Sequence, residues 1–266
     1  MYTIALIPAR YASERFPGKL MQKLGDDTVI VRTWRATLET GLFRKVVVVT
    51  DSREIFQEIV SHGGEACMST GRHLSGSDRI AEAAVHYPKA QVIVNVQGDE
   101  PFTSAGPLKA LLGVFEEPGA ESVDVASLMS PLSDPGEFDN PNVVKVVTDR
   151  QGFALLFSRA PIPYTRDPKG YKTKAFRHIG VYAFRRETLL RFASLAPGPL
   201  ELSEKLENLR FLEYNMRVKM VEVPGYTRGI DVPKDLEEAG KMLNRHYKIN
   251  CVNDNAKEKS IVKFKG

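Results

Sequence analysis

Short apolar runs alternate with amphipathic segments along the first part of the chain. The runs at residues 4–7 and 46–49 contain no polar residue, which is typical of strands buried on both faces of a sheet. Residues 28–40 instead repeat apolar positions at helical spacing, and Ser52 is placed to cap a second helix that runs to about residue 61. This alternation predicts right-handed βαβ units and a mostly parallel central sheet.

The pattern changes in the second half of the chain, where expected strands follow one another directly. Two apolar runs at residues 143–147 and 153–157 flank a turn-forming segment, which predicts a β-hairpin. The helical spacing of Leu202, Leu206 and Leu209 predicts one amphipathic helix with these leucines on its buried side. We therefore expect a single domain over residues 1–245, an inserted β-rich subdomain within about residues 123–215, and a basic tail without periodicity at residues 246–266.

The composition is that of an ordinary soluble globular protein. Of the 266 residues, 42% are hydrophobic and 26% are charged, and the formal net charge is +4. Such a small net charge does not favour a nucleic-acid-binding protein, and it suits basic residues gathered at a site for a small anion. Cys67 and Cys251 provide neither a disulfide framework nor a metal-ligand cluster. We expect a cytoplasmic protein without membrane insertion, because no apolar run reaches the roughly 18 residues that span a bilayer and no signal-peptide pattern is present.

A basic loop follows the first expected strand. It contains Arg10, Arg15 and Lys19 together with Ser13, and Glu14 is its one acidic residue. Open α/β sheets bind ligands at the carboxyl ends of their strands, and guanidinium and ammonium groups suit phosphate oxygens. The loop lacks the glycine patterns of P-loops and dinucleotide-binding sites. It therefore predicts a phosphate site of another kind, although a solvated basic loop between a strand and a helix explains the charges equally well.

The apolar run at residues 92–96 ends in a polar, acidic segment. Gln97, Gly98, Asp99 and Glu100 follow it directly. Mg²⁺ prefers oxygen ligands and is often bound by one or two carboxylates together with substrate phosphates. Asp99 is therefore a candidate magnesium ligand near the basic loop, and the alternative is a turn that Gly98 forms and Asp99 caps.

The segment at residues 72–79 has both a structural and a functional interpretation. It is a polar loop that leads into a helix, and we expect Ser77 or Asp78 to cap that helix. A capped loop alone accounts for this pattern. Ser75 and Gly76 would also let the backbone approach a planar ligand closely.

The strand expected over residues 174–184 places His178, Gly180 and Tyr182 on one face. A histidine beside aromatic residues is more often a hydrogen-bonded core residue than a ligand-binding one. Two hydrogen-bonding side chains that flank a glycine also suit a polyhydroxylated ligand, so both interpretations stay open.

Taken together, these segments resemble the 3-deoxy-manno-octulosonate cytidylyltransferases, also called CMP-Kdo synthetases. The resemblance covers about residues 3–243, and its motifs are IPARYASERFPGK, HLSGSDR, NVQGDEP, NPNVVKVV, FSRAPIPY, RHIGVYAF, PLELSEKLENLR and GIDVPKDLE. One such motif would be weak support, but the whole set in one order is highly specific. The resemblance implies a Rossmann-like α/β/α sandwich of the nucleotide-sugar transferase type, with a β-rich dimerisation subdomain and a homodimeric assembly.

The implied reaction joins CTP and 3-deoxy-D-manno-octulosonate (Kdo) to give CMP-Kdo and pyrophosphate for lipopolysaccharide biosynthesis, with Mg²⁺ as cofactor. In-line attack of a sugar hydroxyl on the α-phosphorus needs positioning and charge neutralisation more than covalent help. The implied catalytic residues are Lys19, Arg10, Arg15 and Asp99. The implied nucleotide-binding residues are Arg10, Ser13, Arg15, Lys19, Ser75, Gly76 and Arg79. The implied sugar-binding residues are Gln97, Arg159, His178, Tyr182, Glu207 and Asn208, and the implied metal ligands are Asp99 and Asp231.

Two positions depart from the family pattern. Leu20 replaces a proline, and Asn208 replaces a glutamine, which shortens a side chain that the resemblance places at the sugar. The alternatives are a cytidylyltransferase for a modified Kdo or a sialic acid, and a catalytically silent nucleotide-binding module. The presence of Asp99, Asp231 and Lys19 favours an enzyme, and the modest net charge disfavours an RNA-binding role for the tail.

Overall fold

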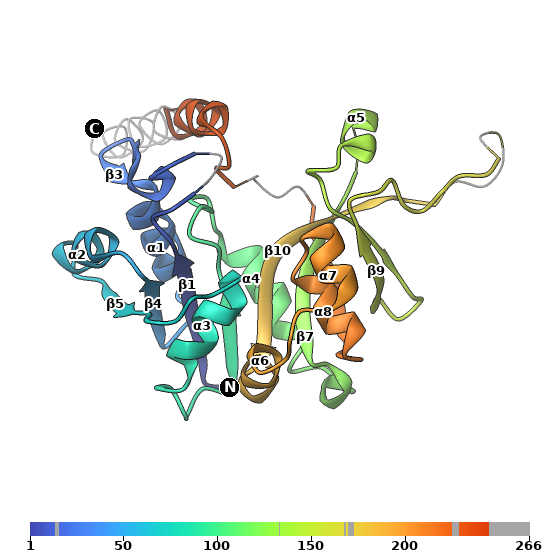
Figure 1. The fold of residues 1–266 in the computed structure, drawn as a ribbon, viewed down its shortest axis with the longest axis horizontal. Helices are drawn as coiled ribbons and strands as arrows, with labels where there is room; N and C mark the ends of the chain where they lie inside the picture. Colours follow the sequence, from blue (N-terminus) through green and yellow to red (C-terminus); the bar gives the residue numbers. More distant parts are fainter. Residues whose placement is uncertain (14–15, 133, 168, 170–172, 225–228, 245–266) are drawn as a thin grey trace, which may run out of the picture.

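A mixed sheet of nine strands forms the centre of the molecule in the computed structural model, which describes residues 1–13, 16–132, 134–167, 169, 173–224 and 229–244 (Figure 1). Its strands are β1 (Thr3–Ala9), β4 (Lys45–Thr50), β5 (Glu65–Met68), β6 (Val92–Asn95), β7 (Val125–Pro131), β8 (Lys145–Thr148), β9 (Ala154–Ser158), β10 (Phe176–Arg185) and β11 (Val218–Glu222). The strand order is β11–β7–β10–β6–β1–β4–β5, with β8 and β9 attached to β10. β10 runs antiparallel to β6 and β7, and the remaining pairs on this path are parallel. The expected mostly parallel sheet is confirmed.

Helices cover both faces of this sheet. One face packs against α1 (Val29–Glu39), α2 (Arg53–Ser61), α4 (Ala105–Gly113) and the helix of residues 233–244. The other face packs against α3 (Gly76–Ala84), α6 (Arg186–Ala193) and α8 (Asn208–Glu213). Within β1, Ala5 and Ile7 belong to the first core and Ile4 and Leu6 to the second, so the strand is apolar throughout. The expected α/β/α sandwich is thereby confirmed.

The remaining short elements lie at the edges of this core. A small two-stranded sheet consists of β2 (Lys23–Leu24) and β3 (Asp27–Thr28), and α5 (Pro135–Asp139) precedes the predicted hairpin. That hairpin is confirmed as the antiparallel pair β8–β9, and β8 also pairs with the start of β10. The boundaries of the β-rich subdomain stay a prediction, and the tail at residues 246–266 lies outside the described residues.

The helix caps agree with the sequence in one case and differ in another. Ser52 caps α2 as predicted, because its side chain accepts a hydrogen bond from the backbone N–H of Ile55. In α3 the cap is Ser75, whose side chain accepts from the N–H of Asp78, so the expectation of Ser77 or Asp78 was wrong. A cap of this kind stabilises a helix by about 1 kcal/mol. The helix therefore begins at Gly76, earlier than either expected cap allows, and presents Ser75 and Gly76 at its start.

The single helix expected around Leu202, Leu206 and Leu209 is instead two short helices, α7 (Pro199–Glu204) and α8. Lys205 separates them with a left-handed backbone conformation at φ 54°. Leu206 and Leu209 are buried as predicted, but Leu202 is 54% exposed. The break changes the direction of the chain, so that one helical face no longer carries all of these leucines.

No helix in the described part of the chain is both long enough and apolar enough to cross a membrane. Cys67 is a free, partly buried thiol, and Cys251 lies outside the described residues.

Candidate active site

Two neighbouring cavities of about 520 Å³ each open near the carboxyl ends of β1 and β6. The one we call the basic cavity includes Arg10, Ser13, Lys19, Ser75, Gly76 and Arg79 in its lining. The one we call the aromatic cavity includes His178, Gly180, Tyr182, Glu207 and Asn208. Gln97, Asp99, Lys205 and Asp231 line both cavities. The cavities therefore meet at both predicted metal ligands, and Arg15 lies outside the described residues.

Lys19 lies between the two aspartates at this junction. Its ammonium forms an ion pair with Asp99 and lies 3.3 Å from Oδ1 of Asp231. Burial by itself would lower the pKa of Lys19, but the two carboxylates outweigh burial and raise that pKa. The protonated side chain is therefore the form that this junction stabilises.

Backbone contacts hold the two aspartates close together. The N–H of Ile230 donates to the carbonyl of Asp99 at 2.9 Å. A Cβ on Gly229 would lie 3.0 Å from Oε1 of Glu100, so a glycine permits this close approach. The N–H of Asp231 in turn donates to Asp235 at 2.8 Å, at the start of the last helix.

The carboxylates at this junction suit a cation that is also bound by oxygen atoms of a substrate. Among the residues that the structure describes, no group of three or more His, Cys, Asp or Glu side chains is arranged to hold a metal. Two carboxylates, of Asp99 and Asp231, nevertheless converge on one positive group, the ammonium of Lys19. Mg²⁺ usually takes one or two carboxylates and completes its shell with substrate phosphates and water. The residues present therefore suit Mg²⁺ bound together with a polyphosphate.

The first turn of α3 forms one wall of the basic cavity. A Cβ on Gly76 would lie 3.1 Å from Cγ of Pro8, so α3 and the end of β1 approach each other closely at this glycine. Arg79 also lines the cavity, but its guanidinium donates hydrogen bonds to Ser69 and to Asp51, the latter at 2.7 Å. We interpret these contacts as holding α3 against the ends of β4 and β5.

Arg159 lines the basic cavity and not the aromatic one. Its guanidinium donates to the backbone carbonyls of Glu204, Pro141 and Lys205 at 2.7, 2.8 and 3.4 Å. The structure thus places the predicted partner of the sugar carboxylate beside the break between α7 and α8, on the basic-cavity side of the junction.

His178 is held as a neutral imidazole in the aromatic cavity. Its Nε2 lies 2.9 Å from Oγ of Ser127, and that hydroxyl can donate its own proton to the carbonyl of Val181 at 3.0 Å. Nε2 therefore carries the proton, and Nδ1 accepts from the side-chain amide of Asn208 at 3.3 Å. Burial lowers the pKa of His178 to about 3. Both ring nitrogens of this histidine are thus engaged by protein side chains, Ser127 and Asn208.

Gly180 leaves the space beside His178 open. The register between β10 and β7 shifts between Ile179 and Tyr182, and nothing lies within 4 Å of a Cβ built on Gly180. The rings of His178 and Tyr182 are 5.5 Å apart, so both side chains lie on the same side of the strand as predicted. Oδ1 of Asn208, on the facing helix α8, is buried with no hydrogen-bond partner in the described structure.

Three comparisons with known proteins agree on the family. The model of the cytidylyltransferase family matches residues 4–218. The 3-deoxy-manno-octulosonate cytidylyltransferase of Flavobacterium johnsoniae is 56% identical over 243 residues, which cover 91% of this chain and 99% of the relative. That of Christiangramia forsetii is 52% identical over 241 residues, 91% of this chain and 96% of the relative.

The chain belongs to the 3-deoxy-manno-octulosonate cytidylyltransferase family. A solved structure of CMP:2-keto-3-deoxy-manno-octonic acid synthetase, described as complexed with CTP, superposes with a TM-score of 0.86 and 32% identity. It matches 92% of this chain and 100% of that protein. A 4-diphosphocytidyl-2C-methyl-D-erythritol synthase from Anaerococcus prevotii, at 12% identity and a TM-score of 0.60, shares the fold alone.

Several side chains at the two cavities of this cytidylyltransferase were missed by sequence reasoning. They are His73, Leu74, Glu100, Asn140, Asn142, Arg177 and Lys205. The motifs HLSGSDR, NVQGDEP, NPNVVKVV, RHIGVYAF and PLELSEKLENLR contain them, with Asn140 and Asn142 both in NPNVVKVV, but no local pattern marks them as site residues. Burial and the neighbouring Asp99 and Asp231 carboxylates raise the pKa of Glu100 well above its usual value.

Glu82 does not line the basic cavity, but it holds a loop that does. Its carboxylate accepts hydrogen bonds from the backbone N–H groups of Thr70 and Gly71 and lies 2.6 Å from Nε2 of His73. Burial by itself would raise the pKa of Glu82, but these hydrogen bonds outweigh burial and lower that pKa to about 2. Glu82 thereby holds the loop that brings His73 and Leu74 to the cavity.

Proposed function

We propose that this chain transfers the CMP group of CTP to Kdo, forming CMP-Kdo and releasing pyrophosphate. The observation that carries this proposal is the junction of the two cavities, where Lys19 contacts both Asp99 and Asp231. Membership of the family and the CTP described for the related structure support CTP as the nucleotide.

In this proposal the basic cavity holds CTP. Arg10, Ser13 and Lys19 supply donors for phosphate oxygens, and we assign the same role to Arg15, which lies outside the described residues. The backbone at Ser75 and Gly76 approaches the nucleobase. The α-phosphorus then lies at the junction of the cavities, where a hydroxyl from the aromatic cavity can reach it in line.

Asp99 and Asp231 are the residues that we propose to hold Mg²⁺. Bound with the nucleotide, Mg²⁺ would neutralise phosphate charge, which is its usual contribution to phosphoryl-transfer chemistry. Lys19, already protonated between the same carboxylates, is placed to pair with phosphate oxygens once the triphosphate is present. The chain thus concentrates positive charge where negative charge develops in the reaction.

The aromatic cavity is the proposed sugar site. Gln97, Tyr182, Glu207 and Asn208 line it with hydrogen-bonding groups, and neutral His178 fixes the amide of Asn208. The buried, unpaired Oδ1 of Asn208 leaves one acceptor for a donor on the sugar. The several hydrogen-bonding side chains of this cavity support a sugar acid with many hydroxyl groups. Asn208 in place of the family's glutamine keeps a modified Kdo as the alternative substrate.

We also propose a homodimer, for which exposed leucines on β9 and α7 are the support. Leu155 and Leu156 on β9, and Leu200 and Leu202 on α7, are each at least 37% exposed. The two elements are joined because Glu204, at the end of α7, accepts hydrogen bonds from Ser158 and from the N–H of Arg159. Exposed apolar side chains on two adjoining elements are the kind of surface that protein interfaces use. The cytoplasmic location stays a prediction.

The deciding experiment measures pyrophosphate release with each nucleoside triphosphate, with and without Kdo. We expect release only with CTP and Kdo together, and loss of release when Mg²⁺ is chelated. Replacing Kdo by N-acetylneuraminic acid tests the sialic acid alternative. Equal turnover of that sugar, or release from CTP alone, would contradict the proposed reaction.

A further inference from the structure

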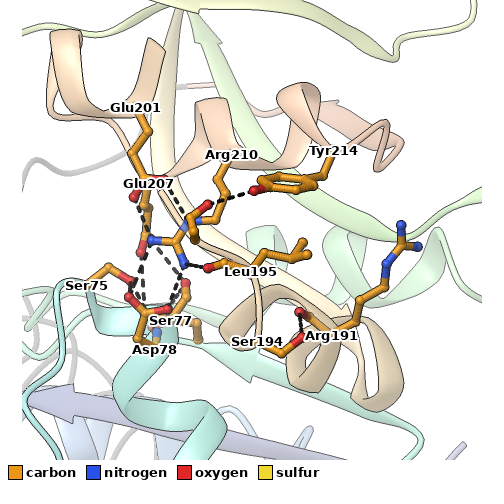
Figure 2. A network of polar contacts seen from close by, with 12 residues as sticks. Ser75, Ser77, Asp78, Arg191, Ser194, Leu195, Glu201, Glu207, Arg210 and Tyr214 are labelled. Carbon is orange, nitrogen blue, oxygen red and sulfur yellow. Dashed lines mark hydrogen bonds and ion pairs between the residues drawn. The ribbon is translucent and has the colours of Figure 1, made fainter. Parts of the chain in front are cut away.

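A buried arginine connects the walls of the two cavities (Figure 2). Arg210, on α8, is 1% exposed. Its Nε and Nη2 atoms each donate to Glu201 of α7 at 2.6 Å, and Nη1 donates to Asp78 of α3 at 3.0 Å. Its guanidinium also lies 4.3 Å from the ring centre of Phe192. These contacts hold the guanidinium fork in one orientation between three helices.

On the α3 side, Arg210 supports the wall of the basic cavity. The second oxygen of Asp78 accepts from the hydroxyl of Ser75 at 2.8 Å, and the N–H of Asp78 donates back to that hydroxyl at 3.1 Å. Ser75 is the cap of α3, and it lines the cavity together with Gly76. The carboxylate of Asp78 therefore links Arg210 to Ser75, so that the guanidinium helps to fix the first turn of α3.

On the α8 side, the same helix carries the wall of the aromatic cavity. Asn208 begins α8, and Glu207 precedes it directly. Glu207 accepts from the N–H and the hydroxyl of Ser77 at 3.4 and 3.2 Å. The starts of α3 and α8 are thus joined twice, by Asp78 with Arg210 and by Ser77 with Glu207. Figure 2 shows both connections side by side.

We propose that Arg210 is a positioning residue that fixes the nucleotide cavity relative to the sugar cavity. The substrates named here rest on the proposed function. Arg210 lines neither cavity, so its effect passes through Asp78 and through α8. The starts of α3 and α8 each form part of one cavity wall, so a shift between them disturbs both binding sites at once. In-line transfer requires the attacking oxygen and the phosphorus to approach within about 3–3.5 Å, so the same shift also lowers kcat.

The test uses two mild substitutions and one matched control. Asp78→Asn keeps a side chain that can bond Ser75 but removes the charge facing Arg210, and Arg210→Lys keeps the charge but loses the fork. We expect each variant to raise the KM for CTP and the KM for Kdo by about three- to tenfold, as is common for coupled contacts. The control is Arg185→Lys, at the far end of β10, where the guanidinium donates to the carbonyls of Val123 and Ala120.

The control should lower the melting temperature while changing neither KM more than about twofold, since independent sites do not couple. A rise in the KM for CTP alone would overturn the proposal, because Arg210 would then serve one cavity only. A lower melting temperature with kcat and both KM values unchanged would also overturn it, since Arg210 would then be purely structural. If Arg210→Lys does not fold, the Asp78→Asn variant decides by the same criteria.

These outcomes are separable from failure of the proposed reaction. If the wild-type protein released no pyrophosphate from CTP and Kdo, the proposed function would fail. Separate calorimetric titrations of wild type and variants with CTP and with Kdo would then still show whether Arg210 supports one cavity or both. If neither ligand bound the wild-type protein, the inference would fall together with the function.

Discussion

The ammonium of Lys19 lies 3.3 Å from a carboxylate oxygen of Asp231, although 212 positions separate the two residues in the sequence. The same ammonium contacts Asp99, in the loop that follows β6. Three segments from the beginning, middle and end of the chain therefore meet at one point. The charges that meet at this point make it sensitive to substitution.

Asp99→Asn should lower kcat by about 100-fold or more, the usual effect of removing one charge-stabilising group from an active site. CTP binding should remain measurable, because the residues of the basic cavity are unchanged. Pyrophosphate release and calorimetry with CTP measure the two effects. Asp124→Asn is a matched control, since Asp124 accepts from the N–H of Arg217 and lines neither cavity. Unchanged turnover in Asp99→Asn would remove Asp99 from the proposed metal site.

Lys19→Ala should reduce kcat more strongly than it raises the KM for Kdo. The reason is that Lys19 is proposed to neutralise charge on the phosphates and not to contact the sugar. Steady-state kinetics with Kdo varied at saturating CTP measure this split, and Lys19→Arg, which keeps the charge, should recover part of the rate. The opposite pattern, a large rise in the KM for Kdo at normal kcat, would contradict the assignment.

The stability of the protein should fall as the pH drops below about 6.5, because His178 is protonated more readily in the unfolded chain than in the folded protein. Its pKa is about 3 in the folded state against 6.5 normally, so the unfolded chain binds the proton more tightly. The stabilisation is therefore present above about pH 6.5 and is lost as the pH falls toward 3, with a slope that approaches about 1.4 kcal/mol per pH unit. Urea unfolding of wild type and His178→Asn between pH 4 and 7 should show curves that converge at low pH. Parallel curves would mean that His178 titrates normally.

The exposed leucines of β9 and α7 predict where the dimer forms. Leu155→Glu and Leu202→Glu should each shift the protein from dimer to monomer, because a charge placed in an apolar interface is costly to bury. Light scattering after size-exclusion chromatography measures the mass. Leu38→Glu serves as the control, since Leu38 is 50% exposed but lies on α1. A wild-type protein that elutes as a monomer would refute the proposed dimer.

The sequence alone determined the features of the fold that depend on local patterns. The apolar runs of β1 and β4, the cap at Ser52 and the β8–β9 hairpin depend on residues close together in the chain, and all were predicted correctly. The basic and acidic loops were recognisable because polar residues follow buried strands directly. The family was recognisable because many motifs occur in one order, and the comparisons confirmed it.

Only the tertiary structure decided how these loops meet. The register shift around Gly180 depends on pairing with β7, and the carbonyls of Glu204 and Lys205, at the break between α7 and α8, accept hydrogen bonds from Arg159. The bond between Arg210 and Asp78 spans 132 positions, and no local pattern distinguishes that arginine from one exposed to solvent. Breaking such a buried contact is costly, because a charge removed from water must find its partner within the protein. Which partner it finds depends on the packing of the whole chain.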